Sequence, residues 1–279
     1  MKYHILTATI WAMLSSHVYS TNIHTTSENV ADSVIADQRV ALAQNTDGKG
    51  FGPQSPRDID NLTGDNHRTF GFAPASSKMN LCNIHFHKNA EHKGGEFTQY
   101  AGNGDGKGYN SGFKYNGSLT KQELAPFSYK HLESGDTIEV HYVYSTADVK
   151  PGPTLGSCLS ETINNPGLRV ESQVFVLVND EKAPDFNDLA FYEMTDGYYQ
   201  ATNIPANTGK PIVYLGSTTG PGYNEKASPF QVTWSVRPKV AKLNIASVAE
   251  WLKKNDFDED HAHGVRNLVV NPKLLSSGN

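Results

Sequence analysis

The sequence predicts a mainly β fold in a single domain, with a central twisted, mostly antiparallel sheet and a few short helices. Short runs with strand-type alternation follow one another between residues 81 and 236, separated by turn-forming residues. The length of 279 residues suits one domain, because all-β domains of about 200 to 250 residues are common. No internal repeat or long low-complexity linker divides the chain.

Five segments have the residue pattern of strands. They are LCNIHFH (81–87), TIEVHYVYS (137–145), LRVESQVFVLV (168–178), IVYLGS (212–217) and FQVTWSV (230–236). Towards the end of the chain, NIASVAEWLKKN (244–255) places Ile245, Val248 and Trp251 on one helical face. This spacing predicts a helix, which a strand or a docked tail would follow.

The first residues of the chain predict export. Lys2 precedes the apolar run ILTATIWAMLSS, and Ser20 offers a small residue for cleavage. This run is too short to span a bilayer comfortably, so we expect a secreted or periplasmic protein with no stable membrane insertion after signal removal. The predicted organisation is a signal peptide at 1–20, an N-terminal extension at 21–47 with a short helix that Ser27 caps, and the main domain at 48–279.

The two cysteines, Cys82 and Cys158, predict a disulfide bond, because an even pair of cysteines in an exported protein is usually oxidised. The bond would tie the predicted strand at 81–87 to the loop at 151–165. Its role would be support.

The charge pattern restricts the partners that the protein can bind. The formal net charge is −5, and acidic and basic residues are interspersed instead of forming blocks. A nucleic-acid partner is therefore not expected, whereas a homodimer is left open.

Histidines on two predicted strands form a candidate metal site. Alternate side chains of a strand share a face, so His85 and His87 would point the same way, with Cα atoms roughly 6.5 Å apart. His141 on another strand would complete the site and leave one position of a tetrahedral zinc ion open, as in catalytic sites. Glu139 shares the face of His141 and can hold the ring nitrogen that does not bind metal. Asn83 stands in the same relation to His85.

The motifs around these histidines resemble those of carbonic anhydrases. NLCNIHFHKNAEH (80–92) resembles the core of the delta class. Four segments resemble alpha-class motifs and occur in the same order as in that class. They are QSPRDI (54–59), NIHFH with the following EH (83–92), IEVHYVY (138–144), and YLGSTTGP with VTW (214–234). The resemblance implies a sheet of the alpha-carbonic-anhydrase type, a zinc cofactor, and carbon dioxide and bicarbonate as the small-molecule substrates.

The resemblance also implies roles for individual residues. The three histidines would bind zinc, and a zinc-bound hydroxide would attack carbon dioxide to give bicarbonate and a proton. Glu91 would accept a hydrogen bond from the threonine hydroxyl that orients the hydroxide. An ungapped match makes this Thr219, but Thr218 stays open, because GSTTGP differs from the alpha pattern just before the paired threonines. Three valines on strand patterns would form an apolar wall for carbon dioxide: Val143, Val176 and Val213.

Other histidines are candidates for moving the proton to solvent. A solvent-facing histidine suits this task, because its pKa lies near neutrality. His67, in a loop ahead of the first ligand strand, is the candidate shuttle, and His92 is an alternative. A second H-x-H, at 261–263, follows the acidic FDED and has no obvious third ligand, so it is expected at the surface or in an interface.

Two other functions fit part of this pattern. A secreted cupin also combines H-x-H, a glutamate and a distant histidine, and Glu91 would then bind iron or manganese. The QSPRDI, GSTTGP and VTW segments have no place in a cupin. A non-catalytic domain could hold zinc on the same three histidines, although carbonic-anhydrase-like domains without activity have a ligand histidine replaced. The sequence therefore favours a zinc-dependent carbonic anhydrase, a lyase.

Overall fold

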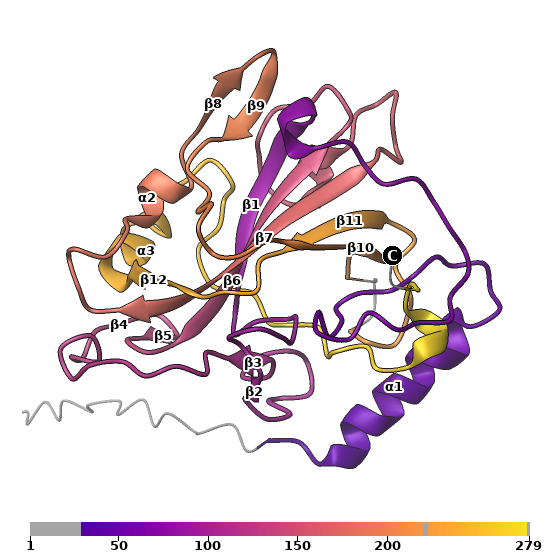
Figure 1. Cartoon of the computed structure of the whole chain (residues 1–279), viewed down its shortest axis with the longest axis horizontal. Helices are drawn as coiled ribbons and strands as arrows, with labels where there is room; N and C mark the ends of the chain where they lie inside the picture. Colours follow the sequence, from indigo (N-terminus) through magenta and orange to yellow (C-terminus); the bar gives the residue numbers. More distant parts are fainter. Residues whose placement is uncertain (1–28, 220–222, 278–279) are drawn as a thin grey trace, which may run out of the picture.

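The structure is a computed structural model that describes residues 29–219 and 223–277. A six-stranded mixed sheet lies at its centre (Figure 1). The predicted signal peptide and the Ser27 cap lie outside the described residues.

The central sheet contains every strand that the sequence predicted. Its members are β1 (Asn80–Lys88), β6 (Thr137–Ser145), β7 (Leu168–Val178), β10 (Ile212–Ser217), β11 (Gln231–Val236) and β12 (Ala241–Asn244). The pairs β1–β6, β6–β7 and β10–β11 are antiparallel. β7 pairs in parallel with β11 along its first half and with β12 along its second half. The sheet is thus mixed, with antiparallel pairs in the majority.

Short strand pairs and helices complete the described part of the chain. The pairs are β2 (Gln99–Tyr100) with β3 (Phe113–Lys114), β4 (Ser128–Tyr129) with β5 (Leu132–Glu133), and β8 (Tyr192–Thr195) with β9 (Tyr198–Ala201). The helices are α1 (Asp32–Thr46), α2 (Phe186–Leu189) and α3 (Ile245–Trp251), with 3-10 turns at Ser76–Lys78, Leu155–Cys158 and Pro272–Leu274. The prediction of a single, mainly β domain is confirmed.

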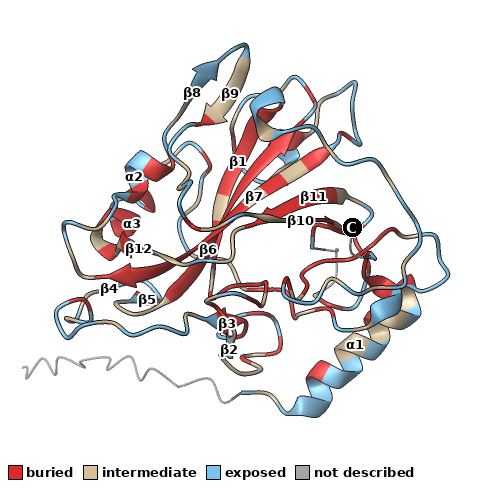
Figure 2. Ribbon diagram, viewed as in Figure 1, coloured by how far each residue is buried: buried red, intermediate tan, exposed pale blue. Residues whose placement is uncertain are grey.

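Both faces of the central strands are buried (Figure 2). Ile84 and Tyr142 lie on one face, in a core that α2, α3 and the β8–β9 pair cover. Val143 and Trp234 lie on the other face, in a second core. Because successive side chains of a strand point to opposite faces, the histidines at positions 85, 87 and 141 all belong to this second face.

Aromatic packing attaches α3 to the first face. The ring centroid of Trp251 lies 4.9 Å from that of Phe186 and 6.1 Å from that of Phe86. The side chain of Asn244 caps the helix by accepting a hydrogen bond from the main-chain N–H of Ala246. The helix predicted near the end of the chain is therefore confirmed.

The helix predicted in the N-terminal extension is also confirmed, as α1. Leu42 of this helix is buried in a small cluster with three residues of the C-terminal tail: Val269, Leu274 and Leu275. In contrast, Val40 is 53% exposed. The two ends of the described chain thus pack together, and the C-terminal segment is the docked tail that the sequence allowed.

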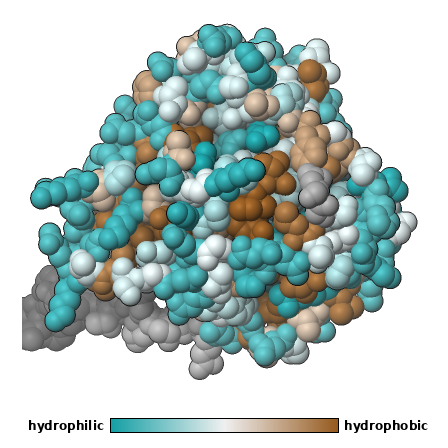
Figure 3. All heavy atoms as spheres, in the orientation of Figure 1, coloured by the Kyte–Doolittle hydropathy of each residue, from teal (hydrophilic) through white to brown (hydrophobic). Residues whose placement is uncertain are grey.

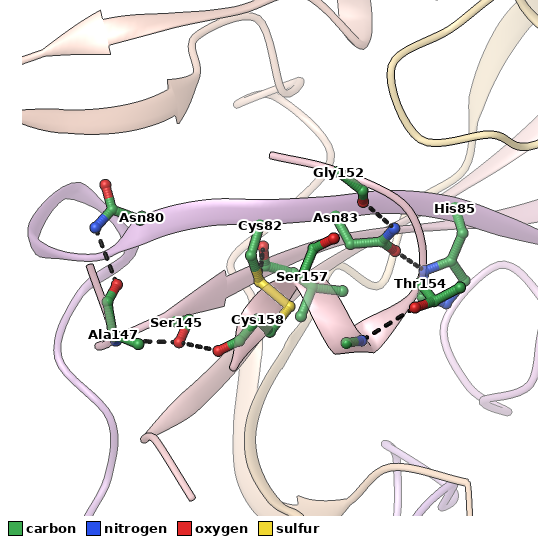
Figure 4. Close-up of a disulfide and its surroundings, with 12 residues drawn as sticks. Asn80, Cys82, Asn83, His85, Ser145, Ala147, Gly152, Thr154, Ser157 and Cys158 are labelled. Carbon is green, nitrogen blue, oxygen red and sulfur yellow. Dashed lines mark hydrogen bonds between the residues drawn. A yellow bond between two sulfur atoms is a disulfide. The ribbon is translucent and has the colours of Figure 1, made fainter. Parts of the chain in front are cut away.

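The predicted disulfide between Cys82 and Cys158 is present (Figure 4). It joins β1 to the 3-10 turn at Leu155–Cys158. Two hydrogen bonds reinforce this link: Gly152 N donates to Cys82 O (3.0 Å), and Ser145 Oγ donates to Cys158 O (2.7 Å). The loop at 151–165 is therefore fastened to the strand that contains His85.

The surface in Figure 3 is mostly hydrophilic, with hydrophobic side chains gathered in patches, the clearest near the middle of the view. Among the described residues, we find no helix with the length and apolar character that crossing a membrane requires.

Replacing both cysteines by serine is expected to lower the free energy of unfolding by about 4 kcal/mol, because the bond closes a long loop in the unfolded chain. The two cysteines are 76 residues apart in the sequence. Guanidinium denaturation of the parent and the Cys82→Ser/Cys158→Ser variant measures the change. Equal denaturation midpoints would contradict it.

Candidate active site

The pairing of β1 with β6 brings the three predicted ligand histidines together. His85 lies directly opposite His141 in the antiparallel register, and His87 lies two residues further along the same face of β1. The ring centroid of His85 is 5.2 Å from that of His87 and 5.1 Å from that of His141, and the remaining pair is 4.8 Å apart. One nitrogen from each ring lies within 4.8 Å of the other two, a spacing that one metal ion can bridge.

Hydrogen bonds fix the tautomers of the two histidines on β1. His85 Nδ1 lies 2.6 Å from Asn83 Oδ1, and Asn83 is itself held because its Nδ2 donates to Gly152 O (3.1 Å; Figure 4). His87 Nδ1 lies 2.8 Å from Gly264 O. Both partner oxygens can only accept, so each Nδ1 carries the proton and each Nε2 keeps its lone pair for a metal.

His141 is held in the opposite sense. Its Nε2 lies 3.1 Å from Glu139 Oε1, and a carboxylate oxygen accepts, so Nε2 is the donor and Nδ1 keeps the lone pair. The site therefore offers two Nε2 atoms and one Nδ1 atom. As the sequence predicted, Glu139 lies against the His141 ring and Asn83 lies against the His85 ring.

The carboxylate of Glu139 is the centre of a buried hydrogen-bond network. It accepts from the main-chain N–H groups of Glu91 (2.7 Å) and His92 (3.1 Å) and from Ser172 Oγ (2.5 Å). It also accepts from His92 Nδ1 (2.7 Å), in addition to His141. Burial by itself would raise the pKa of Glu139, but attraction to His92 and the hydrogen bonds from both histidines hold this pKa well below its usual range.

The network continues away from the metal site. His92 Nε2 lies 2.6 Å from the Tyr214 hydroxyl, which lies 2.5 Å from Ser55 Oγ. All of these groups are buried. The predicted alternative role of His92 as a proton shuttle is therefore wrong, because its ring has no access to solvent and both of its nitrogens are engaged.

Burial also sets the protonation of the candidate ligands in the absence of metal. It lowers the pKa of His85 and His141, and it lowers the pKa of His87 to about 4. Neighbouring imidazoles lower the pKa of all three rings further. The three rings are thus neutral at pH 7 and can donate lone pairs to a cation.

The histidines open onto a small cavity of about 80 Å³. Its apolar wall consists of Val143, Leu155, Val170 and Trp234. Val143 therefore lies where the sequence predicted, but the predictions for two other valines are wrong. Val176 is buried in the core away from the cavity, and Val213 is 36% exposed and lines other surface depressions.

The polar side of the cavity includes Glu91 and both candidate threonines. Glu91 Oε1 accepts a hydrogen bond from Arg266 N (2.7 Å), and burial raises the pKa of its carboxyl group. The predicted hydrogen bond from a threonine hydroxyl to Glu91 is not formed among the described residues. The hydroxyl of Thr218 lies 2.7 Å from Ser228 Oγ instead, and Thr219 is exposed at the edge of the cavity.

Two other histidines with predicted positions are His67 and His263. His67 is exposed and does not line the cavity. The side chain of His263 is 41% exposed, as expected for a surface position, but its ring centroid also lies 5.5 Å from that of His85 and 5.8 Å from that of His87. It lies close to these rings because its main chain pairs with β1: His263 N donates to Phe86 O, and Lys88 N donates to His263 O. Its Nε2 lies 2.6 Å from Glu259 Oε2.

Sequence reasoning missed the residues that the C-terminal segment brings to the site. Gly264 holds His87 through its carbonyl, and Arg266 lines the cavity. Trp234, whose ring centroid lies 5.0 Å from that of His141, was recognised only as part of a motif. No local pattern marks Gly264, because a main-chain carbonyl can come from any residue and its partner is 177 residues away.

A comparison with protein-family models identifies the family of this chain. The model of the delta carbonic anhydrase family matches residues 76–247. This chain belongs to the delta carbonic anhydrase family. The match includes β1, β6 and both candidate threonines, so the predicted recognition is confirmed. Searches of curated proteins and of solved structures found no match.

The donor set fits the metal that carbonic anhydrases typically use. Three neutral imidazoles, each held by an oxygen acceptor at its other nitrogen, suit Zn²⁺. Glu91 is not one of the donors that lie close together, and its carboxylate is held by Arg266 N. A cupin site, in which this glutamate would bind the metal, does not match this arrangement or the family.

The metal-free protein is expected to become less stable as the pH falls from about 7 to about 5.5. The unfolded chain takes up protons on histidines as the pH falls through about 6.5, whereas the buried rings stay neutral to lower pH. Protons therefore favour unfolding, and the free energy of unfolding rises with pH in this range. Chemical denaturation at several pH values measures the slope.

Two variants show whether the buried rings cause this slope. His87→Gln should reduce it, and His67→Gln, which changes an exposed histidine, should leave it unchanged. A parent slope equal to that of His87→Gln would contradict the assignment.

Proposed function

We propose that this protein is a zinc-dependent carbonic anhydrase that catalyses the reversible hydration of carbon dioxide to bicarbonate and a proton. The observation that carries the proposal is the tripod of neutral imidazoles at the floor of a small, partly apolar cavity. Membership of the delta carbonic anhydrase family supports the same reaction.

The three histidines would hold the ion through His85 Nε2, His87 Nε2 and His141 Nδ1. Their hydrogen-bond partners fix which nitrogen is available and hold each ring in place before the metal arrives. Bound zinc would supply a Lewis acid that allows water to ionise near neutral pH. The negative charge of Glu139 would increase the basicity of His141 as a ligand.

The apolar wall would bind the substrate. Carbon dioxide is small, uncharged and without hydrogen-bond donors, so it needs a compact hydrophobic surface beside the nucleophile. Val143 and Val170 from adjacent strands, with Leu155 and Trp234, provide this surface next to the histidines. A cavity of about 80 Å³ is too small for drug-sized ligands, whose pockets are typically at least about 300 Å³.

The polar side would orient the attack. Hydroxide adds to the carbon of carbon dioxide, bicarbonate leaves, and a proton passes to solvent in each cycle. Thr219 is the better candidate for orienting the hydroxide, because the Thr218 hydroxyl is paired with Ser228. Glu91 would assist from the same side of the cavity. The proposal assigns no shuttle, since His67 lies outside the cavity lining.

We also propose that the protein is exported, as its predicted signal peptide at 1–20 implies. The disulfide between Cys82 and Cys158 supports this, because such bonds persist in oxidising compartments.

Stopped-flow carbon dioxide hydration on the purified protein, with its metal content measured, tests the function. The parent should hydrate carbon dioxide and hold about one zinc ion per chain. In His141→Ala, hydration and zinc should fall together, by at least about a hundredfold in each case, since even losing a partner of a ligand costs up to that much.

His131→Ala is the matched control, because His131 is an exposed histidine outside the cavity lining. It should retain both zinc and activity. A parent that is fully loaded with zinc but inactive would contradict the proposed reaction and favour a non-catalytic zinc-binding domain.

A further inference from the structure

Arg266 is a buried arginine at the edge of the proposed active site. Only 2% of its surface is exposed, yet its side chain lines the cavity with Glu91 and Thr219. No carboxylate group among the described residues forms a salt bridge with its guanidinium group. Burial lowers its pKa to about 10, so the group is still charged at neutral pH. A buried charge without an ionic partner is unfavourable unless its hydrogen bonds are well placed.

The two shorter hydrogen bonds of the guanidinium group go to residues that follow β10. Arg266 Nη1 donates to the main-chain carbonyl of Thr218 (3.0 Å), and Nε donates to Asn224 Oδ1 (3.1 Å). A longer contact joins Nη2 to Gln54 Oε1 (3.5 Å). That oxygen also accepts from Ser217 Oγ (3.1 Å) and Ser228 N (3.0 Å). The guanidinium group and Gln54 together therefore hold Ser217 and Thr218 at the end of β10, and Asn224 and Ser228 further along the chain.

The main chain of Arg266 contacts the other side of the cavity. Its N–H donates to Glu91 Oε1, and two residues earlier Gly264 O accepts from His87. One short segment thus connects a candidate ligand, the buried acid and the carbonyl that immediately precedes Thr219. The planar guanidinium fork can reach several acceptors at once, whereas a lysine ammonium acts as a point charge on a flexible stem.

We infer that Arg266 is a positioning residue that fixes Thr219 at the cavity by holding the carbonyl of Thr218. The inference rests on the proposed hydration reaction, in which Thr219 orients the hydroxide. The hydrogen bonds of the Arg266 side chain go to Thr218, Asn224 and Gln54 and not to a candidate ligand, so its effect on the reaction passes through the threonine. Its main-chain bond to Glu91 is kept whatever the side chain, which allows substitutions to separate the two contacts.

A double-mutant cycle tests the inference in the zinc-loaded enzyme. Arg266→Lys should lower kcat/KM by about ten- to a hundredfold, the loss that a displacement of about 1 Å can cause, with zinc content and the pH profile unchanged. Thr219→Ala should lower it at least as much. The Arg266→Lys/Thr219→Ala double variant should be no worse than Thr219→Ala alone. Independent, multiplying losses would overturn the inference, as would loss of zinc from Arg266→Lys.

Two further variants guard against a general loss of structure. Asn224→Gly removes an acceptor of Arg266 and suits the left-handed backbone at this position (φ 51°), so it should show a smaller loss of the same kind. Arg237→Lys is the matched control. Arg237 also donates to two loop carbonyls, those of Ala206 and Gly209, but lies outside the cavity lining. It should leave kcat/KM unchanged, and a loss there equal to that of Arg266→Lys would overturn the inference.

A second readout does not depend on activity. Threonine methyl NMR of the metal-free protein should show shifted or broadened signals from Thr218 and Thr219 in Arg266→Lys, with the buried Thr233 unchanged. Unchanged Thr218 and Thr219 signals would overturn the inference. If the parent shows no hydration at all, the proposed function fails, and these signals still decide whether Arg266 positions the threonine.

Discussion

The buried carboxylate of Glu139 is the point on which the geometry of the site depends. It accepts hydrogen bonds from the candidate ligand His141, from the main-chain N–H groups at positions 91 and 92, and from Ser172 of the neighbouring strand. A buried charge is tolerated only where donors compensate for the loss of water, and here five donors converge on its two oxygens. The same bonds that stabilise the charge therefore fix the orientation of His141 and the position of Glu91.

The rest of the site is built by segments that come from far along the chain. The sheet supplies the three histidines and two valines, but the loop held by the disulfide supplies Leu155, and the C-terminal segment supplies Gly264 and Arg266. The sheet thus holds the histidines and most of the apolar wall, and the loops complete the cavity. Buried hydrogen bonds replace regular secondary structure in fixing these loops.

Much of the fold could be predicted because its signals are local. Strand alternation predicted the five strands, and helical spacing predicted α1 and α3. The H-x-H pattern on one strand and the Glu-x-His pattern on another predicted the three candidate ligand histidines and Glu139 as the hydrogen-bond partner of one of them. The disulfide followed from the number of cysteines and the predicted export. In each case the physical cause, a period of two or about 3.6 residues or a pair of thiols, is visible within a short window.

The parts that were missed depend on contacts between distant residues. Nothing near His263 indicates that its main chain bridges β1, and nothing near Val213 indicates that it lies outside the cavity. The choice between Thr218 and Thr219 could not be made from the motif, because a contact with Ser228 decides which hydroxyl is engaged. Such contacts require the register and the loop paths, which single residues do not encode.

X-ray absorption at the zinc edge of the loaded protein tests the central claim most directly, because it reports which atoms bind the metal. Three imidazole nitrogens, with neither a sulfur nor a carboxylate ligand, are the predicted result, and replacing His141 should remove one of them. A carboxylate ligand from Glu91 or Glu139, or a fourth imidazole from His263, would contradict the account.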